Sequence, residues 1–412
     1  MPFLKNFKNL FLNKVKVKIL RICPAPGYLG KFRELHSLDQ MTWTQQVRSL
    51  QSHNIFLPGS WAWEMEKYGC EVFDSLYDDE DLVRKWAEEN QYLQAYTQTN
   101  PKFDILLKQA EVFKPNVVMF WTGGLYKVDR DHRKFLRKLL PNALFITVWG
   151  DEIPSGESYK SYFGDLDFAF AINRSYSDKF TESGIRSIPF GSSFDTTLAP
   201  AKILPINLRK NDLIMCGDTG FMRQDHVNRY KILSQVIKNT SIKVFSLEPN
   251  GDTSALGKDN PFYKQAPLKA IRPNQVFDGP VDASDYYQLL NESKISINIH
   301  RDEPIDYGNL RCFEACGSGT ILLTDRSNKI SEFFNVETSV EKLKDGKISA
   351  EVIGFNDAKD CEKKIEFLLG NTEIMQRISN NAIKKTRSLY TVKNRSKFMF
   401  NILLNLLSEK NS

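Results

Sequence analysis

The sequence predicts an α/β protein with two Rossmann-like, doubly wound domains that face each other across a cleft. Three observations lead to this fold class. The chain has 412 residues, which is too long for one ordinary core and fits two domains of about 150–200 residues each. Apolar strand-like runs alternate with amphipathic helical stretches, a pattern typical of parallel sheets covered by helices on both faces. The alternation breaks once, at 191–212, and then restarts.

The first half contains six strand-like segments. We expect strands at 15–23, 71–76, 117–121, 143–149, 165–173 and 185–190. We expect helices at 61–69, 80–113, 130–140 and 175–184. The region 28–60 is predicted to be a long loop with helical pieces, because it is rich in polar and aromatic residues.

The second half repeats the pattern. We expect strands at 212–217, 242–247, 274–281, 294–300 and 320–325, helices at about 225–238 and 282–292, and another helix beginning near Asn309. After 356 the chain is predicted to be almost wholly helical. These elements predict an N-terminal domain over 1–200, a second domain over 201–385, and a terminal helix over 386–412 that returns to the first domain.

Composition limits the possible partners. The 56 basic and 50 acidic side chains leave a net charge of +6, which is small for this length and unlike a dedicated nucleic-acid binder. The six cysteines form no CxxC pair, which indicates reduced thiols in the cytoplasm. No apolar run is long enough to span a membrane. Residues 1–14 combine an apolar face with lysines, so this segment either contacts a membrane surface or packs as an ordinary terminal helix.

Two D-x-D patterns, at 79–81 and 165–167, are too short to predict a metal site by themselves. The first begins a polar helix, where acids stabilise the helix dipole, and the second begins a strand. The five histidines show no metal-ligand spacing. We therefore expect no metal.

In open parallel sheets, ligands bind beyond the carboxyl ends of the strands. One such place is the stretch 306–325, "DYGNLRCFEACGSGTILLTD". The first turn of a helix beginning near Asn309 suits a diphosphate, Gly308 allows close approach, and Arg311 adds a cation. Glu314, one turn further, can accept two hydrogen bonds from a ribose diol. Alternatively, Arg311 and Glu314 form only a surface pair.

This stretch resembles the E-x7-E region of GT-B glycosyltransferases of the group 1 type. Asp306 and Glu314 have the spacing of the two acids, although the first acid is here an aspartate. The run from Asn309 to Asp325 is similar to the CgeB-like branch, the spore maturation glycosyltransferase family. The resemblance implies that Glu314 holds the ribose of a nucleotide sugar and that Asp306 lies near the donor sugar.

The resemblance also covers other segments, mainly over 205–330. Residues 217–233 resemble the glycine-rich loop and helix that open the second domain, with Gly217 in the loop and Arg223 and Arg229 as phosphate-binding candidates. Residues 276–300 resemble the elements that carry the base pocket. Arg301, directly after them, is a further candidate for binding the donor.

Two more residues are candidates for catalysis. Asp151 follows an apolar strand that we expect to be central in the first sheet. It is our candidate for a general base or an acceptor-orienting group, the alternative being a helix cap. His300 follows a strand of the second domain, so it is either a cleft residue or a packed histidine.

Together these features predict a glycosyltransferase that moves a sugar from a UDP- or GDP-sugar to a hydroxyl of a glycan, a lipid-linked glycan or a protein. The resemblance implies a retaining enzyme. Arginines and a helix N-terminus can offset the charge of the leaving diphosphate, so we expect neither a metal nor a separate cofactor. The net charge, the cysteines and residues 1–14 predict no nucleic-acid partner and a place in the cytoplasm or at the inner face of the membrane. The alternatives are a non-catalytic envelope or spore assembly protein on the same fold, and an epimerase or phosphorylase.

Overall fold

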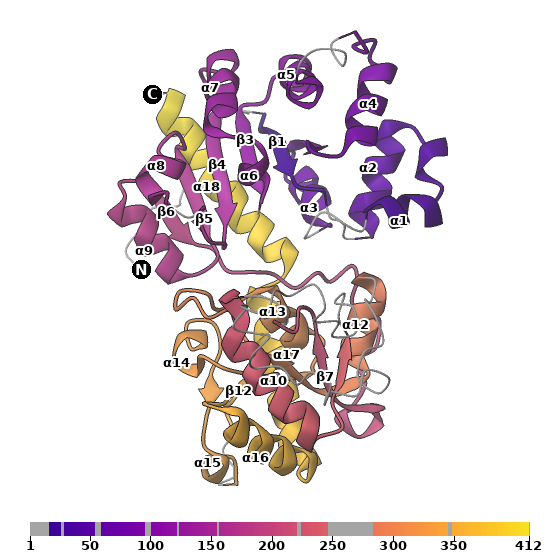
Figure 1. Ribbon diagram of the computed structural model, residues 1–412, viewed down its shortest axis with the longest axis vertical. Helices are drawn as coiled ribbons and strands as arrows, with labels where there is room; N and C mark the ends of the chain where they lie inside the picture. Colours follow the sequence, from indigo (N-terminus) through magenta and orange to yellow (C-terminus); the bar gives the residue numbers. More distant parts are fainter. Residues whose placement is uncertain are drawn as a thin grey trace, which may run out of the picture.

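The computed structural model of the chain describes residues 16–25, 29–53, 59–94, 100–121, 123–154, 156–220, 224–245, 283–344 and 348–411. These residues form an upper and a lower half in Figure 1, each built around one parallel sheet. The expected strand at 274–281 and the segment 1–14 lie outside the described residues.

The first half contains a six-stranded sheet with the order β2-β1-β3-β4-β5-β6. All neighbouring strands are parallel. The strands are β1 (Lys18–Cys23), β2 (Glu71–Leu76), β3 (Val117–Trp121), β4 (Leu144–Trp149), β5 (Phe168–Ala171) and β6 (Ser187–Pro189). The helices of this half are α1 (Leu29–Leu35), α2 (Trp43–Ser52), α3 (Trp61–Lys67), α4 (Glu80–Glu89), α5 (Pro101–Phe113), α6 (Gly124–Lys127), α7 (Arg130–Leu139), α8 (Tyr159–Phe163) and α9 (Arg174–Glu182). The predicted central place of β4 is confirmed.

The second half contains a six-stranded parallel sheet with the order β11-β12-β10-β9-β7-β8. Its strands are β7 (Asn211–Cys216), β8 (Lys243–Phe245), β9 (Ser293–Asn298), β10 (Ile321–Thr324), β11 (Val336–Glu337) and β12 (Val352–Gly354). The helices that follow in the chain are α10 (Val227–Asn239), α12 (Ala283–Asn291), α13 (Leu310–Gly317), α14 (Ser327–Ile330), α15 (Val340–Lys344), α16 (Ala358–Leu369), α17 (Thr372–Leu389) and α18 (Val392–Asn411).

The expected single helix over 80–113 is wrong, because the structure has two helices there. After α4, Gln91 takes a left-handed conformation with φ of 64°, which ends the helix. The second helix, α5, begins after Asn100, whose side chain accepts a hydrogen bond from the backbone N–H of Phe103 at 3.4 Å. Pro101 stands at the first helical position, where its missing N–H costs nothing.

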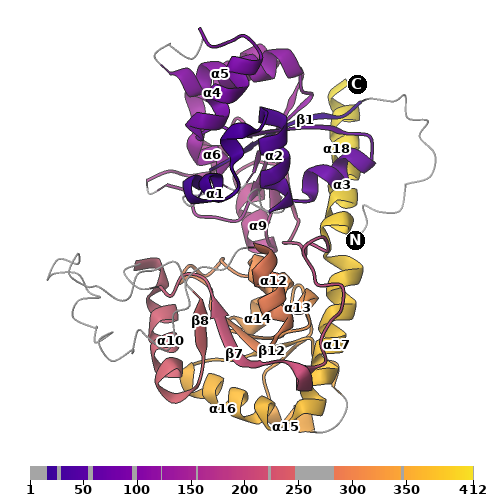
Figure 2. The same ribbon diagram turned by 90° about the vertical axis from the view of Figure 1, so that its right-hand side faces the viewer.

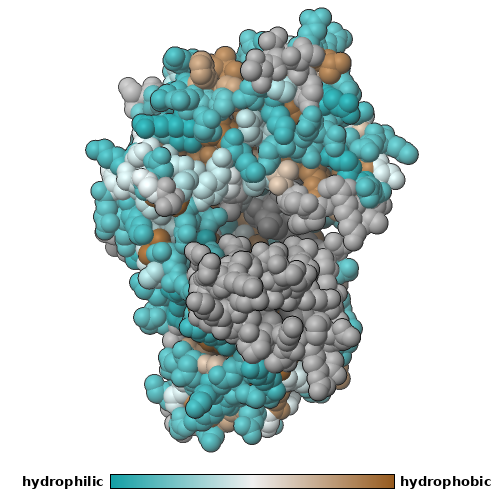
Figure 3. Space-filling model, in the orientation of Figure 1, coloured by the Kyte–Doolittle hydropathy of each residue, from teal (hydrophilic) through white to brown (hydrophobic). Residues whose placement is uncertain are grey.

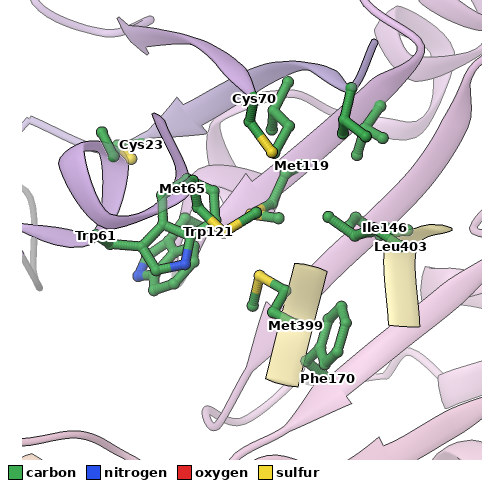
Figure 4. Close-up of a cluster of buried hydrophobic side chains, with 14 of the residues drawn as sticks. Cys23, Trp61, Met65, Cys70, Met119, Trp121, Ile146, Phe170, Met399 and Leu403 are labelled. Atoms are coloured by element: carbon green, nitrogen blue, oxygen red, sulfur yellow. The ribbon is translucent and has the colours of Figure 1, made fainter. Parts of the chain in front are cut away.

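Helix α18 completes the core of the first half. Met399 and Leu403 from α18 lie beside Phe170 and Ile146 of the first sheet (Figure 4). Figure 2 shows α17 and α18 as a nearly continuous column along one side of both halves. Because burial of large apolar side chains is the main favourable term in folding, α18 ties the end of the chain to its beginning.

Two connections run side by side between the halves. Phe194, in the segment between β6 and β7, accepts a backbone hydrogen bond from Val392 at 3.0 Å and donates one to Tyr390 at 2.7 Å. The short break between α17 and α18 is therefore hydrogen-bonded to the segment between β6 and β7, which connects the first half to the second. The exact domain boundaries stay a prediction.

The described surface of the face in Figure 3 is mostly hydrophilic, with small hydrophobic patches. Among the described residues, no helix is both long and apolar enough to cross a membrane. All six cysteines are free and buried.

Candidate functional site

The carboxyl ends of the two sheets meet in the middle of the molecule. In Figure 1 the arrows of β3 and β4 point toward the lower half. The side-chain amide of Asn173, just after β5, donates to the carbonyls of Ile305 at 2.9 Å and Tyr307 at 3.0 Å, both in the loop after β9. The loop 299–309 is thus one segment of the second half that lies against the first.

Arg301 in this loop forms an ion pair that crosses between the halves. Its Nη1 donates to Oδ1 of Asp151 at 2.5 Å, and its Nε lies 3.4 Å from Oδ2 of Asp306. Burial opposes the charge of Arg301, but Asp306 and Asp151 outweigh burial and raise the pKa of Arg301 above its usual value. The structure therefore brings together three of the residues that the sequence singled out, and it places Asp151 opposite the second half as expected.

His300 is packed inside the second half instead of facing open space. It is 1% exposed, and its Nδ1 lies 2.7 Å from Oδ1 of Asp325. The backbone N–H of Gly308 donates to Nε2 at 3.2 Å. Since an N–H can only donate, Nε2 accepts, and the proton lies on Nδ1, where it bonds Asp325. Of the two alternatives for His300, the structure favours the packed histidine, because both ring nitrogens hold the loop in place.

The carboxylate that faces His300 is stabilised in its ionised form. Burial raises the pKa of Asp325, but the attraction of His300 and the hydrogen bonds from its ring and backbone N–H bring the pKa below the usual range. Asp325 also accepts the backbone N–H of His300 at 3.1 Å. This pair fixes the start of the 299–309 loop to the end of β10.

The turn before α13 is set by packing. Gly308 has a φ of 70°, and a Cβ there would lie 2.4 Å from the Phe333 ring. Asn309 caps α13 through its backbone conformation, while its side-chain amide donates to Oδ1 of Asn298 at 3.2 Å. The predicted helix start near Asn309 is confirmed. The sequence assigned Gly308 to phosphate approach, but in the structure this glycine is required by its φ and by Phe333.

Arg311, in the first turn of α13, lies against Gly217 at the end of β7. A Cβ on Gly217 would be 2.2 Å from Nη2 of Arg311, so a larger residue here would displace the guanidinium. Arg229, from α10, donates to the carbonyls of Ile299 at 2.8 Å and Asp218 at 3.0 Å. Burial, followed by repulsion from Arg311, lowers the pKa of Arg229 to about 10. Two cations therefore lie close together at the carboxyl edge of the second sheet.

Glu314 lies one turn further along α13 and is 4% exposed. Burial raises its pKa to about 7, although Arg311 and the hydroxyls of Tyr286 and Tyr287 favour the carboxylate. The alternative of a surface pair with Arg311 is excluded by this burial. Arg223 lies outside the described residues.

Several residues of this region were missed by the sequence reasoning. Asn173 joins the halves, as described above, and its Oδ1 also caps α9 by accepting the N–H of Tyr176 at 3.0 Å. Glu332 accepts the N–H of Arg174 at 3.2 Å, and Tyr307 donates to Glu332 at 2.7 Å. The Asn-x-x pattern before a helix is a cap signal that could have identified Asn173, but no local signal identifies Glu332.

The D-x-D acids have structural partners. Asp79 caps α4 by accepting the N–H of Leu82 at 2.7 Å and pairs with Arg33 at 2.6 Å. Asp165 pairs with Arg133 at 2.7 Å. Within the described ranges, no group of three or more His, Cys, Asp or Glu side chains is arranged to hold a metal ion.

Comparison with known proteins places this geometry in context. Residues 243–401 match the model of the glycosyl transferase-like family. Comparison of the sequence with curated proteins gave no match.

Solved structures resemble nearly the whole chain. HepE of Anabaena in complex with UDP-glucose has a TM-score of 0.59 at 11% identity, covering 94% of this chain and 99% of that chain. The sucrose-phosphate synthase of Thermosynechococcus elongatus has a TM-score of 0.58 at 10% identity, covering 96% and 100%. An alpha-glucosyltransferase in complex with UDP-glucose and DNA has a TM-score of 0.55 at 11% identity, covering 95% and 99%. The chain therefore has the GT-B fold, and residues 243–401 are similar to the glycosyl transferase-like family.

Proposed function

We propose that the chain transfers a sugar from a nucleoside-diphosphate sugar, UDP- or GDP-linked, to a hydroxyl group. The observation that carries this proposal is the pair of neighbouring guanidinium groups, that of Arg311 beside Gly217 and that of Arg229 beside Asp218. Their mutual repulsion is relieved by an anion with more than one charge, and the first turn of α13 adds unpaired N–H groups and partial positive charge. A diphosphate meets these requirements.

The rest of the donor is positioned by α13. Glu314 lies one helical turn beyond the proposed diphosphate site. When its carboxylate is ionised, it accepts hydrogen bonds from the ribose hydroxyls. Asp306, held beside Arg301, faces the sugar. The UDP-glucose complexes of HepE and of the alpha-glucosyltransferase support this class of donor, because both share the fold over most of the chain.

The acceptor side is formed by the first half. Asp151 orients the acceptor hydroxyl or removes its proton, and Arg301 keeps the carboxylate in place. The leaving diphosphate is stabilised by the arginines and the helix, so the reaction needs neither a metal nor a separate cofactor.

We expect activity to survive EDTA, and its complete loss with recovery on Mn²⁺ addition would contradict this mechanism. Resemblance to the CgeB-like branch implies retention at the anomeric carbon, which NMR of the product tests.

The acceptor is a glycan, a lipid-linked glycan or a protein. We further propose that residues 1–14 contact the inner face of the membrane, because an apolar face and lysines suit an anionic lipid surface. Equal liposome binding by the full chain and by a chain starting at Asn13 would refute this contact.

A donor screen tests the main proposal. Thermal shift with UDP-, GDP-, ADP- and CMP-sugars should reveal one binder, since a ligand at 100 times its Kd stabilises by about 2.7 kcal/mol. The binder should be slowly hydrolysed.

In Glu314→Ala the donor should bind about 10- to 150-fold more weakly, because the ribose loses a charged acceptor worth about 1.5–3 kcal/mol. Unchanged affinity in folded Glu314→Ala would remove Glu314 from the site, and binding without hydrolysis or transfer would favour a non-catalytic assembly protein.

A further inference from the structure

His300 joins three segments of the second half. Its backbone N–H and its Nδ1 both lie within hydrogen-bonding distance of Oδ1 of Asp325, directly after β10, at 3.1 Å and 2.7 Å. Its Nε2 accepts the backbone N–H of Gly308 at 3.2 Å. Gly308 directly precedes Asn309, the N-cap of α13. The imidazole therefore connects the ends of β9 and β10 to the turn from which α13 starts, and the mechanism above gives it no role.

A second donor shares Nε2 of His300. Nδ2 of Asn298, the last residue of β9, lies 3.3 Å from Nε2. Oδ1 of Asn298 accepts a hydrogen bond from Nδ2 of Asn309 at 3.2 Å. The polar groups thus form a chain from the N-cap of α13 through the imidazole to Asp325, in which each group donates to the next. A hydrogen-bonded chain of buried groups holds its members in one arrangement.

The ring holds this turn in only one tautomer. The backbone N–H of Gly308 can only donate, so Nε2 of His300 carries a lone pair and Nδ1 carries the proton. Oδ1 of Asp325, 2.7 Å from Nδ1, is the acceptor that favours this tautomer. The ring is buried, so its nitrogens depend on these protein groups for their hydrogen bonds. The geometry therefore gives a separate task to each ring nitrogen.

The two parts of α13 are held in different ways. The body of the helix is held by apolar packing, because Phe313 and Cys316 are fully buried in one core cluster with Leu322 of β10. The start of the helix also depends on polar contacts, since the side chain of Asn309 bonds β9 instead of the helix N–H groups. The unpaired N–H groups of the first turn take their direction from the turn at Gly308.

We propose that His300 is a positioning residue for the diphosphate of the donor. It holds the turn at Gly308, which aims the N–H groups of the first turn and places Arg311 at the start of α13. The part of the helix around Glu314 does not depend on it. The proposal rests on the proposed nucleoside-diphosphate donor and adds to it an enclosed residue that acts through the backbone. Removing the acceptor at Nε2 should therefore weaken binding of the diphosphate more than binding of the nucleoside.

Two substitutions separate the tasks of the ring nitrogens. In His300→Gln the side-chain oxygen reaches about as far as Nε2 and accepts the N–H of Gly308. In His300→Asn the shorter amide reaches only as far as Nδ1, so it bonds Asp325 and leaves Gly308 without its acceptor. A buried N–H without an acceptor is costly, so the turn moves to another position. His132→Asn, the same change on α7 of the first half, is the matched control.

Binding measurements on the full chain test this role. The probes are UDP and GDP, measured by calorimetry, and uridine and guanosine, measured by ligand-observed NMR. The diphosphate that binds the wild type should bind His300→Asn about tenfold more weakly, which corresponds to about 1.4 kcal/mol, while its nucleoside binds the two proteins equally. His300→Gln and His132→Asn should bind both probes like the wild type. A histidine needed only for general packing would instead weaken both probes by the same factor.

Two further measurements need no ligand. Hydrogen exchange read by mass spectrometry should be faster over 301–309 in His300→Asn than in the wild type or in His300→Gln. The chain has five histidines, so in a spectrum of ¹⁵N-labelled histidine the signal that His300→Gln removes belongs to His300. At pH 8 that signal should show the proton on Nδ1.

The role is overturned if His300→Asn binds the diphosphate like the wild type, if the diphosphate and the nucleoside weaken by the same factor, or if the His300 signal shows the proton on Nε2. If His300→Asn does not fold, His300→Gln decides. Retained diphosphate binding with wild-type exchange over 301–309 then supports the role, and weakened diphosphate binding overturns it. A wild type that binds neither UDP nor GDP refutes the proposed donor and this role together, which distinguishes the two failures.

Discussion

The two sides of the candidate site are built differently. On the second half, His300, Glu314 and Asp325 are at most 7% exposed and their polar atoms are held by neighbours in the same half. On the first half, the Asp151 side chain is 40% exposed, and its partner comes from the opposite half. The difference indicates that the second half presents a preorganised surface, while the first half presents groups that act on whatever enters between the halves.

The largest expected effect tests the exposed side. Asp151→Asn keeps the shape of the side chain and removes its charge, so turnover should fall about 10²–10⁴-fold if Asp151 takes the proton of the acceptor. The donor Kd should change little, because the donor lies on the second half. Steady-state kinetics together with calorimetry of the donor check both statements.

Asp178→Asn, an exposed acid on α9, is the matched control and should retain wild-type kinetics. A fall of less than tenfold in Asp151→Asn would make Asp151 an orienting group. Loss of the thermal transition would make the pair with Arg301 structural, and Glu152 would then be the next candidate. His300 is no longer a candidate, because its ring is enclosed.

The second prediction concerns the buried side. The pKa of Glu314 is raised from 4.5 to about 7, so between these values the folded state holds a proton that the unfolded state has lost. The resulting stabilisation is complete below pH 4.5 and is lost as the pH rises through 7. Relative to Glu314→Gln, the wild type should lose roughly 2–4 kcal/mol of unfolding free energy between pH 4.5 and 8, at 1.36 kcal/mol per pKa unit.

Urea unfolding at a series of pH values measures this difference. The glutamine variant removes the titration while it keeps hydrogen-bonding atoms near Tyr286 and Tyr287. Parallel pH curves for the two proteins would show that Glu314 has the same pKa in the folded and unfolded states, and the contrast between a buried and an exposed side of the site would then be weaker.

The sequence predicts the strands well for a physical reason. The segment 117–121 is a short apolar run bounded by turn residues, and a fully buried parallel strand requires this composition. The end of such a strand marks the edge where ligands bind, so Asp151 and Arg301 were singled out before their contact was known. The GT-B fold predicted from these runs and from the stretch 306–325 is confirmed.

The remaining features depend on contacts between distant segments. The role of His300 follows from β10 lying beside β9, which brings Asp325 to the imidazole. The burial of Glu314 follows from the tyrosines of α12. Local signals at Gln91 and Asn100 separate α4 from α5. The sequence prediction missed this break because it gave more weight to the apolar periodicity that runs through both helices. Neither the register of the strands nor the relative position of the halves can be predicted from the local pattern of residues.

The smallest expected effect concerns a contact between the two halves. Glu332, from the second half, places its carboxylate at the N-terminus of α9, where it accepts the N–H of Arg174 at 3.2 Å. A negative charge at a helix N-terminus stabilises by about 0.3–1 kcal/mol when exposed. Glu332→Gln keeps the shape but removes the charge, so it should lower the unfolding free energy by that amount at low salt and by less at 0.5 M NaCl.

Glu182→Gln, at the last residue of the same helix, removes an acid from the negative end of the dipole, so it should raise the unfolding free energy. If Glu332→Gln changes nothing while Glu182→Gln stabilises, α9 behaves as an ordinary helix and the carboxylate of Glu332 does not remain at it in solution. Near the site, the loop 299–309 would then be held to the first half through Asn173 and the pair between Arg301 and Asp151.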